Sequence, residues 1–78
     1  MQGTLFYNKA MGRYDFEYED EDGTKNYYGG IHCGEVFEIQ LNDVWVPARV
    51  EYQDGAWYLV GLHGLKLDGL CVRRQART

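Results

Sequence analysis

Four side chains of the soft type that binds zinc occur in this chain of 78 residues: His32, Cys33, His63 and Cys71. None of them has the C-x-x-C or H-x-x-x-H spacing that forms a zinc site. His32 and Cys33 are adjacent, so on a strand they would point to opposite faces. We therefore expect no metal and no other cofactor. We expect both cysteines to be reduced, half-buried small hydrophobes rather than a disulfide.

Nucleophilic and acid–base catalysis find little support in the sequence. The chain contains no serine, which excludes the serine nucleophile of acyl transfer. Five of its twelve carboxylates lie within residues 17–22, and the sequence places no histidine to act with them as a general acid or base. We therefore predict that the protein is not an enzyme and has no catalytic residue.

The net charge of −4 is unevenly distributed. Residues 12–43 carry nine acidic side chains against two basic ones, whereas residues 44–78 carry five basic against three acidic. This balance argues against binding to nucleic-acid phosphates. The acidic stretch could instead imitate a nucleic-acid backbone and occupy the basic groove of another protein, or it could be a plain solvated face. The predicted acidic surface consists of Glu17, Glu19, Asp20, Glu21 and Asp22.

The chain is rich in aromatic side chains, with seven tyrosines, two tryptophans and three phenylalanines. Buried tyrosine and tryptophan need partners for their polar atoms, so a core of this size cannot enclose them all. Trp45, Pro47 and Arg49 alternate along one expected strand and therefore share a face. Because Trp, Tyr and Arg dominate protein–protein hot spots, this row indicates a partner-binding surface, although Trp45 could also close a barrel end beneath the N-terminal hairpin. The predicted site comprises Trp45, Arg49, Tyr27, Tyr28 and Tyr58.

Short strands must position these side chains. Glycine, asparagine and aspartate interrupt the chain roughly every six to ten residues, which is typical of strands joined by tight turns. Residues 13–18, 35–41 and 44–52 alternate in polarity, which indicates half-buried strands. Residues 57–62 are apolar on both faces, which indicates a central strand covered on both sides. The expected strands are residues 4–7, 13–18, 35–41, 44–52, 57–62 and 70–74.

Five or six short strands in a chain of this length predict an all-β fold, a small bent sheet closed into an SH3-like barrel of antiparallel strands. An open sheet with one helix is the alternative. The length allows a single domain, residues 1–78, with its core at about 3–74 and a flexible C-terminal tail at 75–78. No stretch approaches the ~18 apolar residues of a membrane span, and no signal-peptide pattern is present. We therefore expect a cytoplasmic protein without a membrane partner.

Five short motifs carry a resemblance to a known family. They are G-R-Y-D at 12–15, H-C-G-E at 32–35, W-V-x-x-R-V-E-Y at 45–52, W-Y-L-V-G at 57–61 and G-L-x-V-R at 69–73. Over about residues 3–74 the chain resembles a family of short uncharacterised domains, a domain of unknown function, encoded in Gram-positive bacteria and often on their mobile elements. The resemblance implies a bacterial cytoplasmic setting and an accessory gene, and it implies no activity.

Three functions are compatible with these residues. The leading hypothesis is a non-enzymatic module that binds a protein partner through surface aromatics. The second is an acidic inhibitor or nucleic-acid mimic that acts on a host defence or DNA-processing protein. An exposed aromatic patch could equally be a homodimer contact. The third function is single-stranded nucleic-acid binding, whose basic groove only Arg49, Arg73, Arg74 and Arg77 could form.

Overall fold

The structure is a computed structural model and describes residues 1–74. The expected flexible tail at 75–78, with Arg77, lies outside these residues. Seven strands form one antiparallel sheet in the order β3-β2-β1-β7-β4-β5-β6. No helix within residues 1–74 has the length and apolar character needed to cross a membrane. The strands are β1 (Gln2–Asn8), β2 (Arg13–Glu19), β3 (Lys25–Tyr27), β4 (Val36–Leu41), β5 (Val44–Gln53), β6 (Ala56–Leu59) and β7 (Cys71–Arg73).

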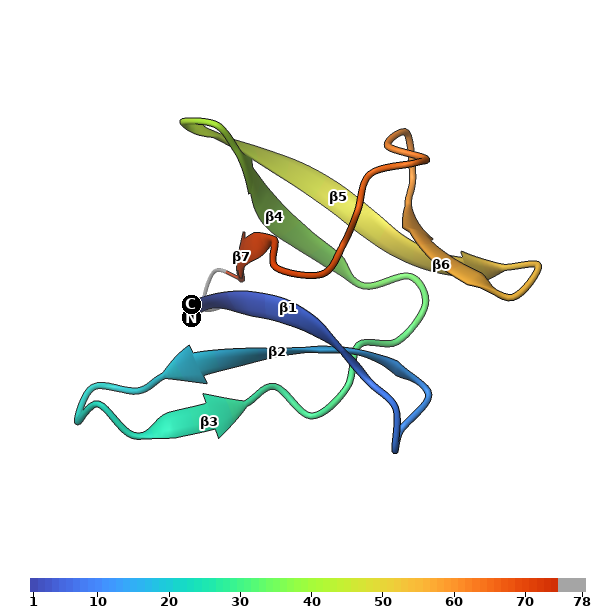
Figure 1. The fold of residues 1–78 in the computed structure, drawn as a ribbon. Coiled ribbons are helices and arrows are strands. Elements are labelled where there is room, and N and C mark those ends of the chain that lie inside the picture. Colours follow the sequence, from blue (N-terminus) through green and yellow to red (C-terminus); the bar gives the residue numbers. More distant parts are fainter. Residues whose placement is uncertain (75–78) are drawn as a thin grey trace.

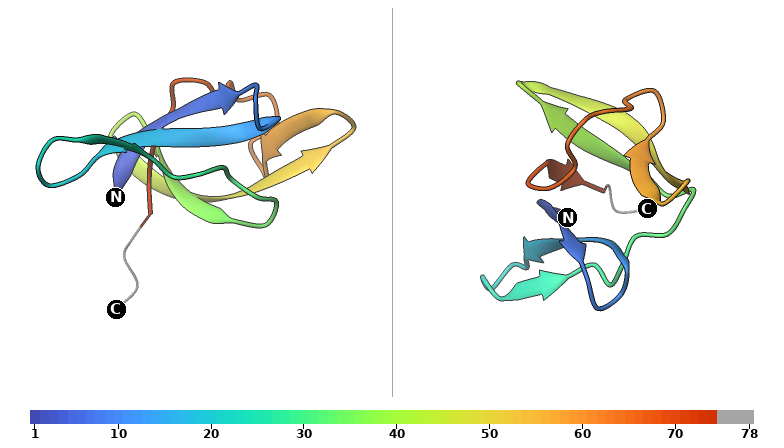
Figure 2. Two further views of the ribbon diagram at one scale, coloured as in Figure 1. Left: turned by 90° about the horizontal axis from the view of Figure 1, so that it is seen from below. Right: turned by 45° about the vertical axis from the view of Figure 1, so that its right-hand side comes forward.

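The sheet bends over on itself so that its two halves face each other. The hairpin of β1 and β2, with β3 beside it, forms one half, and β4, β5 and β6 form the other (Figures 1 and 2). β7 joins the halves by pairing with β1 on one side and β4 on the other. The core lies between the halves, where Phe16 is fully buried and its ring stacks on Tyr28 at 4.8 Å. The buried apolar residues are Leu5, Phe16, Ile31, Phe37, Ile39, Ala48, Val50, Leu59, Leu67 and Val72.

Short turns fix the register of the hairpins. Asn42 and Asp43 alone separate the paired ends of β4 and β5, and Asp54 and Gly55 do the same for β5 and β6. Asp54 and Gly55 both have positive φ, at 54° and 80°, which is the backbone that a two-residue type I′ turn requires. These turns determine which side chains of the three strands share a face.

The all-β prediction is confirmed, and the sheet has seven strands where five or six were predicted. The additional strand is β3, which forms because residues 25–27 turn back after the acidic loop and pair with residues 17–19 of β2. The two ends of the strand order, β3 and β6, each pair with one neighbour within residues 1–74. In that part of the chain the sheet is open, so closure into an SH3-like barrel is not confirmed.

The prediction of a central strand at residues 57–62 is wrong. β6 ends at Leu59, lies at the edge of the sheet and is followed by a turn at Gly61, whose φ is 81°. The apolar side chains of the outer face are only partly covered, since Tyr58 is half-buried and Val60 is 41% exposed. There the ring of Tyr58 stacks on His63 from the next turn, with centroids 4.4 Å apart. This contact with the neighbouring turn covers only part of the outer face of β6.

Candidate binding surfaces

Trp45, Pro47 and Arg49 lie on the outer face of β5, as the alternation predicts. Ala48 and Val50, between and beyond them, are buried in the core. The directly opposed residues of β4 point to the same side as their partners. The outward-facing pairs are Gln40 with Trp45, Glu38 with Pro47, and Val36 with Arg49.

Trp45 is half-buried beneath an arginine of β7. The Cζ atom of Arg73 lies 4.1 Å from the centroid of the Trp45 ring. The same guanidinium donates to both carboxylate oxygens of Glu38, with Nε–Oε1 at 2.9 Å and Nη2–Oε2 at 3.3 Å. A cation over the ring and a two-point ion pair together hold the indole in one orientation.

The surface around this stack combines apolar and charged groups. Val36 is 52% exposed and Pro47 is exposed beside it. The Arg49 side chain is 55% exposed and its Nε lies 3.1 Å from Oε2 of Glu51. Tyr58 of β6 pairs with Glu51 and therefore shares this outer face. The structure thus places three of the five predicted partner-binding residues, Trp45, Arg49 and Tyr58, on one outer face, spread along the length of β5.

The other two predicted residues lie elsewhere. Tyr27 is on the edge strand β3, at the far end of the strand order, where it is 56% exposed and packs edge-on against Phe6 with centroids 5.8 Å apart. Tyr28 turns inward, and its ring stacks on Phe16 and meets Phe37 edge-on at 5.4 Å. The predicted five-residue site is therefore divided over two outer surfaces and the edge of the core.

Tyr28 belongs to a polar cluster that the sequence did not reveal. Its hydroxyl donates to Oε1 of Glu35 and accepts from Nη1 of Arg74, which also lies 2.8 Å from Oε1. The backbone N–H of His32 donates to Oε2 of Glu35 at 2.7 Å. Burial opposes ionisation of Glu35, but the hydrogen bonds from His32, Tyr28 and Arg74 outweigh it and lower the pKa of Glu35. Burial and then the bond to Glu35 raise the pKa of Tyr28.

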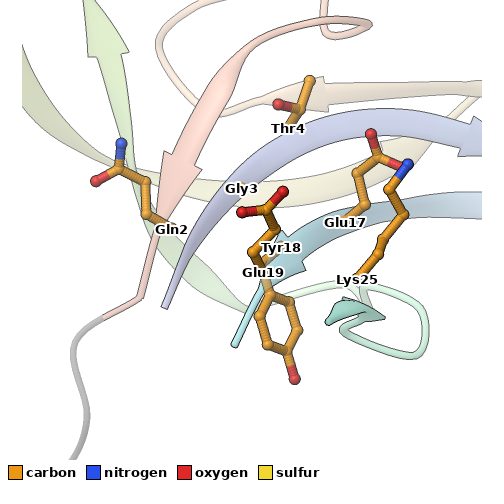
Figure 3. A pocket seen from close by; sticks show the side chains of 7 residues that line it. All are labelled: Gln2, Gly3, Thr4, Glu17, Tyr18, Glu19 and Lys25. Atoms are coloured by element: carbon orange, nitrogen blue, oxygen red, sulfur yellow. The ribbon is translucent and has the colours of Figure 1, made fainter. Parts of the chain in front are cut away.

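The predicted acidic surface is only partly a row of free carboxylates. Glu17 lies 3.7 Å from the ammonium of Lys25, and both line a shallow hollow that Glu19 also borders (Figure 3). Asp20 and Asp22 both accept a hydrogen bond from the backbone N–H of Thr24, at 3.1 and 2.9 Å. These two aspartates therefore stabilise the turn itself. The remaining predicted members, Glu19 and Glu21, are exposed.

Both cysteines are free thiols. Cys71 is half-buried as predicted, and Nε2 of Gln2 lies 3.6 Å from its Sγ. The same prediction is wrong for Cys33, which is exposed because it occupies the turn that precedes Gly34, whose φ is 90°. Among residues 1–74 no three His, Cys, Asp or Glu side chains gather where they could hold a metal ion.

One further functional candidate was missed from the sequence. The alternation of β2 places Asp15 on its polar face, beside Glu17, yet Asp15 is only 2% exposed. Its Oδ1 accepts hydrogen bonds from the backbone N–H of Phe16 at 2.8 Å and of Gly29 at 3.0 Å. The sequence shows an acidic residue at this position but not its burial, because the burial depends on residues 27–29, which are distant in sequence.

Comparison with known proteins places the chain in a family. A crystal structure of a protein from Ruminococcus gnavus, a structural genomics target, is 51% identical in sequence and superposes with a TM-score of 0.81. The match covers 95% of this chain and 100% of that one. No curated protein matches the chain. A family model described as a domain of unknown function, DUF5348, matches residues 3–74, and the chain therefore belongs to the DUF5348 family.

Proposed function

We propose that the protein is a non-enzymatic binding module that engages a protein partner through the outer face of β5, with Trp45 at the centre and Arg49 and Tyr58 at the margins. The observation that carries this proposal is the stack of Arg73 on Trp45, 4.1 Å from the ring centroid, on a face that points away from the core. A side chain already held in place loses little conformational entropy when a partner binds it.

The composition of this face also supports the proposal. Val36 and Pro47 supply exposed apolar surface, while Arg49 and Arg73 stand beside Glu51 and Glu38 at its margins. An apolar centre within a rim of charged groups is the usual arrangement of a protein–protein contact. Tryptophan and arginine are also the residue types that most often dominate the binding energy.

The test is capture of a partner by the full chain and by a double variant. Immobilised protein is incubated with bacterial lysate, with and without nuclease treatment, and retained proteins are identified by mass spectrometry. We expect one protein to bind the wild type and to be lost with Trp45→Ala/Arg49→Ala. A matched control, Tyr52→Ala/Lys66→Ala, removes an exposed aromatic and an exposed cation from elsewhere and should keep the partner.

Circular dichroism and the urea midpoint of the double variant decide how a loss is interpreted. If Trp45→Ala/Arg49→Ala unfolds, these residues are structural and the assignment of the site is wrong. Retention of the same partner by the folded variant also contradicts the proposal. If salt strongly weakens the binding, the acidic-inhibitor hypothesis is favoured. Loss of all captured protein on nuclease treatment favours nucleic-acid binding. Recovery of the protein alone favours a homodimer.

A further inference from the structure

A second hollow lies above Asp15, on the outer face of the sheet at the end formed by β1, β2 and β3. It is about 520 Å³ in volume and is formed where the β1–β2 hairpin meets the segment after β3. Its position on β1, β2 and β3 separates it from β5 in the strand order. It is lined chiefly by Phe6, Lys9, Met11, Asp15, Tyr27 and Gly29.

The floor of this hollow is a buried carboxylate with one oxygen in use and one free. Oδ1 of Asp15 accepts both backbone hydrogen bonds, from Phe16 and from Gly29. Within the described residues Oδ2 accepts none. The one fully enclosed side-chain polar atom without a partner in that part of the chain is Nε1 of Trp57, so Oδ2 is not fully enclosed, and Asp15 lines the hollow.

The carboxylate also lacks an ion-pair partner among the described residues. Within residues 1–74 Asp15 forms no ion pair, although it is 2% exposed. A buried charge is usually paired with an opposite charge, because removing it from water is costly. Asp15 therefore presents an unpaired carboxylate to a ligand that enters the hollow.

The walls are suited to a cation with an apolar stem. Phe6 and Tyr27 stand nearly perpendicular, with an interplanar angle of 72°, and form an aromatic corner beside the carboxylate. Faces of aromatic rings attract cations, and thioether and aromatic carbons cover an alkyl chain. Gly29 leaves its part of the hollow open, since a Cβ built at this position meets no heavy atom within 4 Å.

We propose that this hollow binds the alkylammonium group of a lysine side chain on a protein partner. Because Oδ1 of Asp15 is occupied, only one carboxylate oxygen is free, whereas a guanidinium binds best through two parallel hydrogen bonds. A point-like ammonium needs one oxygen and can place its remaining donors toward water. The site stands on Asp15, Phe6 and Tyr27 and is independent of the β5 surface.

Lys9 provides a second test of the proposal, because its substitution should change the affinity in the opposite direction to that of Asp15. It lines the hollow, but within residues 1–74 it forms no ion pair with Asp15 or with another acid. Its charge therefore repels an incoming ammonium. Replacing it with the neutral Lys9→Gln should strengthen binding, whereas replacing Asp15 should weaken it.

The test is a titration of the isotopically labelled full chain with Nα-acetyl-lysine-N-methylamide, followed by the NMR signals of the two amides that donate to Asp15. We expect saturable shifts of the Phe16 and Gly29 amides. The Nε-acetylated lysine, which is neutral, should leave them unmoved, and the corresponding arginine derivative should bind more weakly. Asp15→Asn should weaken binding about tenfold or more, because it removes the negative charge and replaces the free carboxylate oxygen with an amide nitrogen, which cannot accept from an ammonium.

Controls separate this site from general attraction to an acidic protein. Asp43→Asn removes an exposed carboxylate from the β4–β5 turn and should leave the lysine affinity unchanged at constant ionic strength. If Asp15→Asn does not fold, Tyr27→Ala carries the test, because this ring is exposed on an edge strand and its loss should weaken binding several-fold. Equal shifts with the neutral lysine, unchanged affinity in the folded Asp15→Asn and Tyr27→Ala variants, or no saturation overturn the proposal.

Discussion

Replacing Tyr28 with phenylalanine separates a structural role of this residue from the partner-binding role that its sequence context suggests. The substitution removes the hydroxyl that donates to Glu35 and accepts from Arg74, and it keeps the ring that stacks on Phe16 at 4.8 Å. The direct contact between Arg74 and Glu35, at 2.8 Å, remains. The variant therefore tests one hydroxyl within an otherwise intact cluster.

The magnitude follows from the environment of the hydroxyl. Hydrogen bonds to charged groups contribute about 1.5–3 kcal/mol to stability. The side chains of Glu35 and Arg74 are 19% and 34% exposed, so water can partly replace the lost bond. We therefore expect Tyr28→Phe to lower the free energy of unfolding by about 1.5 kcal/mol, the lower end of that range. In a chain of this size the midpoint of thermal unfolding should fall by about 6–12 °C.

The assay is urea unfolding at neutral pH, followed by tryptophan fluorescence. Tyr27→Phe is the matched control, because Tyr27 is the adjacent residue and its hydroxyl makes no hydrogen bond within residues 1–74. We expect the control to match the wild type within about 0.5 kcal/mol, the usual range for surface substitutions. If Tyr28→Phe is no less stable than Tyr27→Phe, the cluster does not stabilise the fold and the reasoning is refuted.

Two further predictions concern the stability of the same fold. A Cβ built at Gly3 would lie 2.0 Å from the carbonyl oxygen of Glu17, so Gly3→Ala should destabilise the protein by about 1–3 kcal/mol through overpacking; thermal unfolding of the variant measures this loss, and an unchanged midpoint would contradict it. The native pKa of Glu35 is lowered below its usual 4.5, so the stabilisation from its ionised form is present above about pH 4.5 and declines as the pH falls through the native pKa. The stability difference between wild type and Glu35→Gln should therefore be largest near pH 7 and shrink below pH 4, and a constant difference in denaturant titrations across this range would exclude the assigned role.

Alternating polarity predicts most of this sheet because it is a local property of each strand. Residues 13–18, 35–41 and 44–52 all correspond to observed strands. β3 has three residues, too few to show a period of two, and it forms because the preceding turn returns the chain to β2. The edge position of β6 was also missed, because its outward-facing residues are apolar although Val60 among them is 41% exposed and Tyr58 is only half-buried.

The grouping of Trp45, Arg49 and Tyr58 follows from local rules as well. The period of β5 puts Trp45 and Arg49 on one face, and the two-residue turn at 54–55 sets the register that adds Tyr58. These constraints act over a few residues and can be read from the chain without knowledge of its tertiary contacts.

The placement of Tyr27 and Tyr28 on opposite sides of the sheet could not be predicted fully from these local rules. Adjacent residues of an extended chain point to opposite sides, so Tyr27 and Tyr28 could not both have joined one outer surface. The period alone does not state which of them turns inward. That choice follows from the register of β3 on β2, which pairs Tyr27 with Glu17 on the outer face and leaves the Tyr28 ring to stack on Phe16. With Tyr28 turned inward, Tyr27 faces outward against Phe6, so the register that places Tyr28 in the cluster around Glu35 also positions one wall of the hollow over Asp15.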